Sequence, residues 1–140
     1  MIKLNNPSQS ITIADIEEFE MNFQIKLPGN YRELLLKLNG GYNYNADDVL
    51  NTLYSIKHGE NTVEFGIQVN QIWEKNIPKE YLAIGCTGVG DEITICIKEG
   101  ENYGKIFLFR LDTFEADFLS ESLEELLGVE SVKELINDAD

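Results

Sequence analysis

The segment Glu92-Ile-Thr-Ile-Cys-Ile-Lys98, followed after a polar loop (99–104) by Lys105-Ile-Phe-Leu-Phe-Arg-Leu111, decides the fold of this chain. In the first segment isoleucine alternates with smaller or more polar side chains, which is the pattern of a half-buried strand. The second is apolar at nearly every position and predicts a strand covered over most of its surface. The loop has two glycines and suits an open hairpin. With the shorter apolar run 81–84, these segments predict an antiparallel meander.

Two amphipathic helices are predicted before the meander. The first follows a possible N-cap at Thr12 and has apolar residues at positions 13, 16, 19 and 23, with its glutamates on the solvated face. The second begins near Leu27-Pro28 and ends at Asn39-Gly40-Gly41, because glycine accepts the left-handed conformation of a helix C-cap. Its apolar stripe consists of Tyr31, Leu34, Leu35 and Leu38.

The remaining elements are shorter. Segment 49–57 predicts one strand, 63–75 a helix, and 122–128 a helix capped by Ser122. Residues 131–136 predict a last short helix that frays toward Asp140, whereas 1–9 reads as a loose lead-in and 111–119 as turn and edge material. The sequence therefore predicts one domain over residues 1–140, with an α+β fold. Its mostly antiparallel sheet has a meander in the C-terminal half and is flanked by helices.

The charge is strongly acidic. Twenty-five Asp and Glu residues stand against eleven Lys and Arg residues, for a net charge of −14. Nucleic-acid backbones and anionic membranes both require clustered basic residues, so neither is an expected direct partner. A basic protein partner fits better, because complementary charge steers association. Acidity that serves only solubility is the alternative interpretation.

Composition also bears on location and cofactors. No apolar run approaches the ~20 residues of a membrane span, and the N-terminus lacks the pattern of a signal peptide, so we expect a cytoplasmic protein with free thiols. Two cysteines and one histidine cannot supply four zinc ligands. The loop around Asn43 and Asn45 resembles a calcium loop only faintly, because the glycine and glutamate of an EF-hand are missing. We therefore expect no metal and no cofactor.

Three features could be mistaken for catalytic chemistry. The glycine-rich segment 85–90 precedes a strand, whereas a dinucleotide fingerprint opens a helix. Asp91 and Glu92 are adjacent, so on an extended chain their side chains point to opposite faces. His58 lacks a recognisable nucleophile motif nearby. We expect no catalytic site, and a small-molecule enzyme or sensor would require a deep pocket with convergent polar groups.

The segment Leu27-Pro28-x-x-Tyr31-x-x-x-Leu35-x-x-x-Asn39-Gly40-Gly41 resembles the signature of the SUKH superfamily, which contains fungal cell-wall assembly regulators and bacterial toxin-immunity proteins. The resemblance continues through Ile84-Gly85-x-x-Gly88-x-Gly90-Asp91, Gly104-Lys105-Ile106-Phe107 and Ser122–Leu127. Order and spacing agree over Ile13–Leu127. One departure is that 109–112 lacks the histidine that often follows this part of the family pattern.

The resemblance implies a non-enzymatic protein with a SUKH-like fold. A small member of this superfamily is similar to immunity proteins, which bind a cognate toxin domain, often a cationic nuclease. The alternative that the resemblance allows is a regulatory scaffold for a cell-wall or signalling protein. We interpret the signature residues as scaffold, with Asp91 bonded to a nearby loop: Leu27, Pro28, Tyr31, Asn39, Gly40, Gly41, Gly85, Gly88, Gly90, Asp91 and Gly104. The predicted partner-binding residues are acidic or aromatic: Tyr42, Tyr44, Asp47, Asp48, Glu60, Glu64, Glu99, Glu101 and Tyr103.

Overall fold

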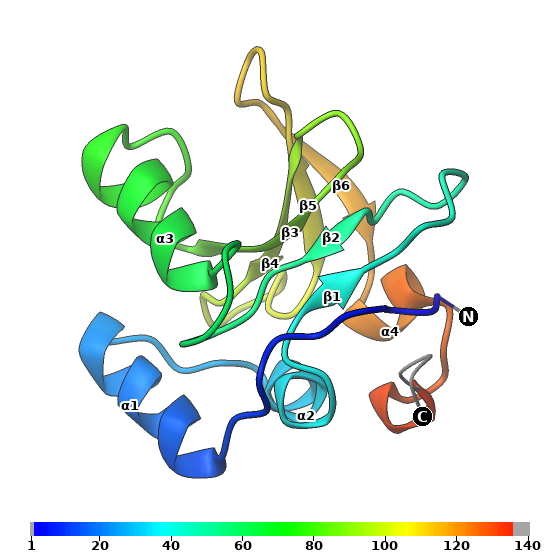
Figure 1. Cartoon of the computed structure of the whole chain (residues 1–140). Coiled ribbons are helices and arrows are strands. Elements are labelled where there is room, and N and C mark those ends of the chain that lie inside the picture. Colours follow the sequence, from blue (N-terminus) through cyan, green and yellow to red (C-terminus); the bar gives the residue numbers. More distant parts are fainter. Residues whose placement is uncertain (1, 136–140) are drawn as a thin grey trace.

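Six antiparallel strands form one sheet in the order of the sequence, and helices pack around it (Figure 1). The structure, a computed structural model, describes residues 2–135. The strands are β1 (Gly41–Tyr42), β2 (Thr52–Leu53), β3 (Tyr81–Cys86), β4 (Glu92–Cys96), β5 (Ile106–Phe109) and β6 (Ala116–Ser120). The helices are α1 (Ile13–Phe23), α2 (Gly29–Lys37), α3 (Val63–Ile67) and α4 (Leu123–Leu127), with a π-helix η1 (Gln68–Trp73) and a 3-10 helix η2 (Val132–Glu134). The α+β fold and the antiparallel meander are therefore confirmed.

The first helix, α1, begins as the sequence predicts. Thr12 and Asp15 form a reciprocal capping box, in which each side chain accepts a hydrogen bond from the other residue's backbone N–H. Ile16 and Phe19 are buried. Glu20 differs from the prediction of a solvated face, because its Oε2 accepts a 2.7 Å hydrogen bond from the backbone nitrogen of Leu27. This carboxylate thus joins the end of α1 to the entry of α2.

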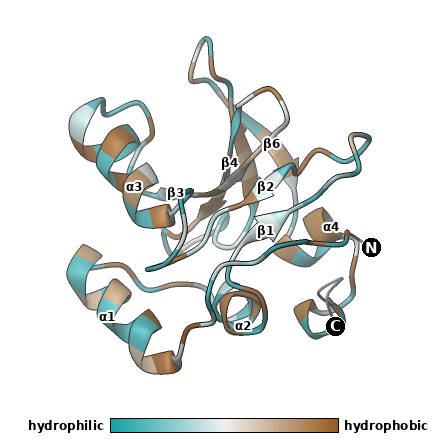
Figure 2. Cartoon of the chain, in the orientation of Figure 1, coloured by the Kyte–Doolittle hydropathy of each residue, from teal (hydrophilic) through white to brown (hydrophobic). Residues whose placement is uncertain are grey.

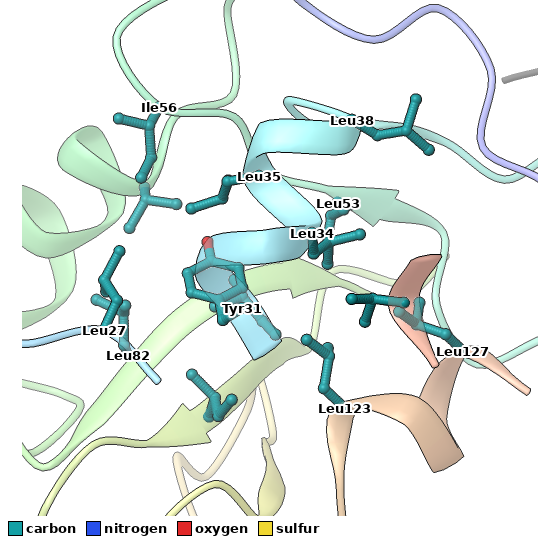
Figure 3. Packing of buried hydrophobic residues seen from close by; sticks show 14 of the residues in the cluster. Leu27, Tyr31, Leu34, Leu35, Leu38, Leu53, Ile56, Leu82, Leu123 and Leu127 are labelled. Carbon is teal, nitrogen blue, oxygen red and sulfur yellow. The ribbon is translucent and has the colours of Figure 1, made fainter. Parts of the chain in front are cut away.

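The core is centred on α2 (Figure 3). Tyr31, Leu34 and Leu35 are completely buried, and residues from the sheet and α4 surround them. Each such side chain contributes about 1.5–3 kcal/mol by leaving water. The buried hydroxyl of Tyr31 has no hydrogen-bond partner within residues 2–135.

The central strand β4 is covered on both faces. Ile93 and Ile95 belong to the core, and Thr94 and Cys96 on the opposite face are also buried. The prediction of a half-buried strand is therefore wrong. On the second face an aromatic cluster extends across the sheet, with ring centroids 5.1–5.9 Å apart; its members are Tyr81, Phe107, Phe109 and Phe118. These side chains come from three other strands, so the period-2 pattern of β4 alone gave no sign of them.

The N-terminal segment is not a loose lead-in. Ile2 and Leu4 are buried, and Asn5 exchanges two 2.8 Å backbone hydrogen bonds with Tyr42 of β1. The backbone nitrogen of Ile2 also donates to the carbonyl of Leu127 in α4, at 3.1 Å. The burial of these two apolar residues and the backbone pairing together hold the N-terminal segment in place, although its polar composition had predicted a loose lead-in.

Two other segments refine the predictions. The region expected to be turn and edge material contains most of strand β6, which pairs with β5 at the edge of the sheet, with a register shift between Ile106 and Phe107 of β5. The helix predicted over 63–75 is present, but it changes from α3 to the wider π-helix η1. The predicted last helix is reduced to η2 in the described part, and residues 136–140 lie outside it. Among residues 2–135, no helix has the length and apolar character needed to cross a membrane.

Candidate functional site

A cleft of about 480 Å³ lies between the loop 43–51, the end of β6 and α4. Three carboxylate residues line it: Asp47 and Asp48 from the loop and Glu125 from α4. The apolar part of its wall comes from Val49, Leu119, Leu126 and neighbouring residues. We call this feature the acidic cleft. In Figure 2 the loop is coloured as hydrophilic along most of its length.

The loop is held in shape by the buried side chain of Asn43. Its Nδ2 donates to the carbonyl of Leu50 at 2.9 Å and to Oδ2 of Asp48 at 3.0 Å. Its Oδ1 accepts from the backbone nitrogen of Asn45, whose own Oδ1 accepts from Asp47. These successive Asx-turns are the reason that asparagine suits this loop. They fix the backbone that carries Asp47 and Asp48, so the carboxylates belong to an ordered loop.

The opposite wall is fixed by α4. The Ser122 hydroxyl accepts a 3.1 Å hydrogen bond from the backbone nitrogen of Glu125, which caps the helix. Leu123 and Leu127 anchor the other side of the helix in the core. Glu125 therefore stays exposed and lines the cleft.

The cleft carries unbalanced negative charge. Five ion pairs occur on the surface, and none of them, within residues 2–135, includes Asp47, Asp48 or Glu125. Among the described residues that line the cleft, there is no lysine or arginine. A second groove, of about 590 Å³ between the end of α1 and η1, is lined instead by Lys26, Lys79 and Lys98 together with Glu80. Charge is thus distributed unevenly between the two grooves, and the acidic cleft is the one that suits a cation.

The predicted partner-binding residues do not form one surface. Asp47 and Asp48 line the acidic cleft, and Tyr44 on the same loop is 69% exposed, with its hydroxyl bonded to Asn6. Tyr42 lies in β1, where its hydroxyl accepts from Asn61. In an antiparallel meander alternate connections lie at the same end of the sheet. The β1–β2 loop is therefore at one end, whereas the opposite end carries Glu60, Glu64, Glu99, Glu101 and Tyr103.

Some residues have a structural task. Glu64 accepts a 2.7 Å hydrogen bond from the backbone nitrogen of Lys57, so it is committed to the fold.

Glu125, in contrast, was missed as a site residue because the sequence placed it in the capping turn of a helix. A pattern along the chain cannot show that this turn faces a loop more than seventy positions earlier. Among residues 2–135, no group of three or more His, Cys, Asp or Glu side chains has a geometry suited to a metal ion.

Local geometry constrains several of the signature residues. Gly40 has φ +84°, and a Cβ there would lie 3.0 Å from the carbonyl oxygen of Leu53. At Gly85 a Cβ would lie only 2.5 Å from the carbonyl oxygen of Thr52. Asp91 bonds a nearby loop, as predicted, because its Oδ1 accepts from the backbone nitrogen of Leu111 at 2.7 Å. Gly88 is the exception, since a Cβ there would meet open space and its φ is not left-handed.

Comparison with known proteins adds one match. A family model described as "SMI1 / KNR4 family (SUKH-1)" matches residues 10–128. Those residues include the loop 43–51, the end of β6 and α4, which together form the acidic cleft. Among curated proteins, no sequence matches this chain significantly.

Proposed function

Because this chain belongs to the SMI1 / KNR4 family (SUKH-1), we propose that it is a protein-binding module that uses the acidic cleft to hold a basic partner. The superfamily that the sequence resembles includes toxin-immunity proteins and cell-wall regulators. Of these two roles we favour the immunity protein. It would bind a cognate toxin domain in the cytoplasm and keep that domain from its substrate.

The observation that carries the proposal is the combination of charge and apolar wall in the acidic cleft. Asp47, Asp48 and Glu125 have no ion-pair partner within residues 2–135, and Val49 beside them is 47% exposed. A lysine or arginine side chain has an aliphatic stem and a charged end, so it can pack its stem on Val49 and Leu126 while its charge meets the carboxylates. Buried anchors surrounded by polar groups are the usual anatomy of a specific interface.

A nuclease is the toxin class that this chemistry fits best. Nucleases hold phosphates with clustered basic side chains, and those side chains attract an acidic protein. The net charge of −14 would accelerate the encounter, and an inhibitor seated on the basic groove would exclude nucleic acid.

The test uses co-expression with a candidate toxin domain, sought first in the neighbouring reading frames. We expect protection of the host cell and a stoichiometric complex whose association slows as salt rises. The double variant Asp47→Asn/Glu125→Gln should bind at least tenfold more weakly, because each lost interfacial ion pair costs on the order of 1.5 kcal/mol or more.

The matched control is Glu17→Gln/Glu18→Gln. It removes the same amount of charge from the exposed face of α1, so it changes long-range steering without touching the acidic cleft. If both variants weaken binding equally, the overall charge determines the affinity and contact at the acidic cleft does not. Unimpaired toxicity on co-expression would refute the immunity role and favour the regulatory scaffold.

A further inference from the structure

A third pocket, of about 200 Å³, lies between the sheet and the helical segment formed by α3 and η1. Ile93 points into the core, so its neighbour Glu92 points to the opposite face, where it lines this pocket with Tyr54. Phe65 of α3, with Val69 and Asn70 of η1, forms the facing wall. We call this feature the Glu92 pocket.

The carboxyl group of Glu92 accepts a hydrogen bond and has no ion-pair partner among residues 2–135. Its Oε2 accepts a 2.8 Å hydrogen bond from the hydroxyl of Tyr54. Within residues 2–135 no lysine, arginine or histidine pairs with it. Burial raises the pKa of Glu92 to about 7, and the hydrogen bond from Tyr54 opposes that rise only in part. Ionising this carboxyl group in its site is costly, so it is partly protonated near pH 7, and a bound cation would favour the ionised form.

The titratable groups next to Glu92 do not supply that cation. Tyr54 has a raised pKa because it is buried and faces the carboxylate, so it stays neutral at physiological pH. The other neighbour is the thiol of Cys86, which is paired with Glu92 across β3 and β4. Neither group carries positive charge, so the described residues next to Glu92 provide no cation for it.

The facing wall is suited to a flat cation. Phe65 is 57% exposed, and it lines the pocket. Aromatic rings attract cations to their faces, and guanidinium groups stack on them most often. The π-helix η1 is a second, independent indication of a binding site, because π-helical turns occur frequently at functional sites. It places Val69 and Asn70 along the pocket, with the backbone nitrogen of Glu74 donating to the carbonyl of Val69 at 2.9 Å.

We propose that the Glu92 pocket binds the guanidinium group of an arginine side chain, with Glu92 as the ionic partner and Phe65 as the stacking surface. That the arginine belongs to a protein partner rests on the proposed function. An anion would be repelled by Glu92, and a divalent metal would find one carboxylate where it needs several oxygen ligands. An ammonium ion lacks the planar face that stacks on Phe65.

The first test needs no partner. Propylguanidinium chloride is titrated into the full chain, and the Glu92 side-chain carboxyl and the resonances of Phe65 and Val69 are followed by NMR. Saturable shifts at these residues are expected, together with a fall in the pKa of Glu92, because a nearby cation favours the ionised form. Glu92→Gln should weaken binding at least tenfold, whereas the control Glu17→Gln, at an exposed glutamate of α1, should leave it unchanged.

Two outcomes would overturn the inference. The first is equal shifts in Glu92→Gln and in the unaltered protein, which would show that the carboxylate is not the site. The second is equally strong binding of propylammonium, which would remove the role of the planar group.

The proposed function and the guanidinium site can fail independently of each other. A toxin complex without binding of the probe would leave the proposed function standing and refute the guanidinium site. Binding of the probe without any toxin complex would support the site and refute the toxin as its partner.

Discussion

The side-chain amide of Asn39 pairs with the backbone of Ile56 in both directions. Its Nδ2 donates to the Ile56 carbonyl at 2.9 Å, and its Oδ1 accepts from the Ile56 nitrogen at 2.8 Å. The same Nδ2 donates to the carbonyl of Gln9, also at 2.9 Å. One buried side chain therefore takes the place of a strand and connects three segments that are distant in sequence.

Asn39→Asp should destabilise the protein by about 3 kcal/mol or more. The variant has the same shape, but it loses both donated hydrogen bonds and places a carboxylate against two carbonyl oxygens. Urea unfolding measures the change. Asn6→Asp makes the same substitution at an exposed position and should stay within about 0.5 kcal/mol of the parent. Similar losses for both variants would contradict the role of Asn39.

Gly85→Ala should be among the most damaging alanine substitutions in the sheet. The new Cβ would lie 2.5 Å from the backbone oxygen of Thr52 and 2.9 Å from Cδ1 of Leu50, so β2 and β3 would have to separate. We expect a loss of about 2–3 kcal/mol, seen as a lower Tm. Gly88→Ala, in open space, should leave Tm unchanged or slightly raised. If Gly85→Ala leaves Tm unchanged, the pairing of β2 with β3 at this position is loose.

Tyr31→Phe should keep or increase stability, by up to about 1 kcal/mol. The substitution removes a buried hydroxyl that has no hydrogen-bond partner in the described part of the chain, and it leaves the packed ring in place. Tyr31→Leu provides the contrast, since loss of ring contacts should cost at least 2 kcal/mol, on the order of other large-to-small core changes. If Tyr31→Phe loses more than about 1 kcal/mol in urea unfolding, the hydroxyl is hydrogen-bonded in solution.

The stability of the protein should depend on pH through Glu92. Its pKa is about 7 in the folded chain, against an ordinary value of 4.5, so the folded state holds this proton more tightly than the unfolded state does. The free energy of unfolding therefore falls as pH rises from about 4.5 to about 7, by on the order of 3 kcal/mol. Glu92→Gln should remove this slope and be the more stable form above pH 7.

The measurement is the difference between the two proteins, because other carboxylates titrate in the same range. Urea unfolding at pH 4.5, 6 and 7.5 gives the slope for each. Asp15, whose pKa is lowered to about 2 chiefly by its hydrogen bond from Lys57, acts in the opposite sense. Its contribution is lost only as pH falls from about 3.8 toward 2, outside the range of Glu92. Parallel pH profiles of the parent and Glu92→Gln would contradict the raised pKa.

Local patterns were sufficient to predict most of the fold. The capping box of α1, the apolar stripe of α2 and the strand pattern of β3 to β5 are properties of neighbouring residues, and the structure confirms them. The N-terminal segment could not be predicted in the same way. Ile2 and Leu4 are only two apolar residues in a polar stretch, and their burial depends on β1 and α4, which come much later in the chain.

The sites were less predictable for the same reason. Asp47 and Asp48 were predicted from local acidity, but their partner in the cleft, Glu125, comes from another element. Glu92 and Asp91 bond to different parts of the chain, and the pairing of Glu92 with Tyr54 depends on β2 and β3 lying beside β4. The π-helix has no sequence signal that we recognise. A hydrophobic pattern therefore predicts the helices and strands, whereas the pockets between them depend on how these elements pack.

The bond between Ile2 and Leu127 sets an order of events during synthesis. Every strand pairs with the one made just before it, so the growing sheet can assemble as the chain leaves the ribosome. The first residues cannot complete their contacts in that way, since α4 is translated more than a hundred codons later. Until then Ile2 has no carbonyl at Leu127 to bind, and a nascent chain halted before that point should remain sensitive to proteases at its beginning.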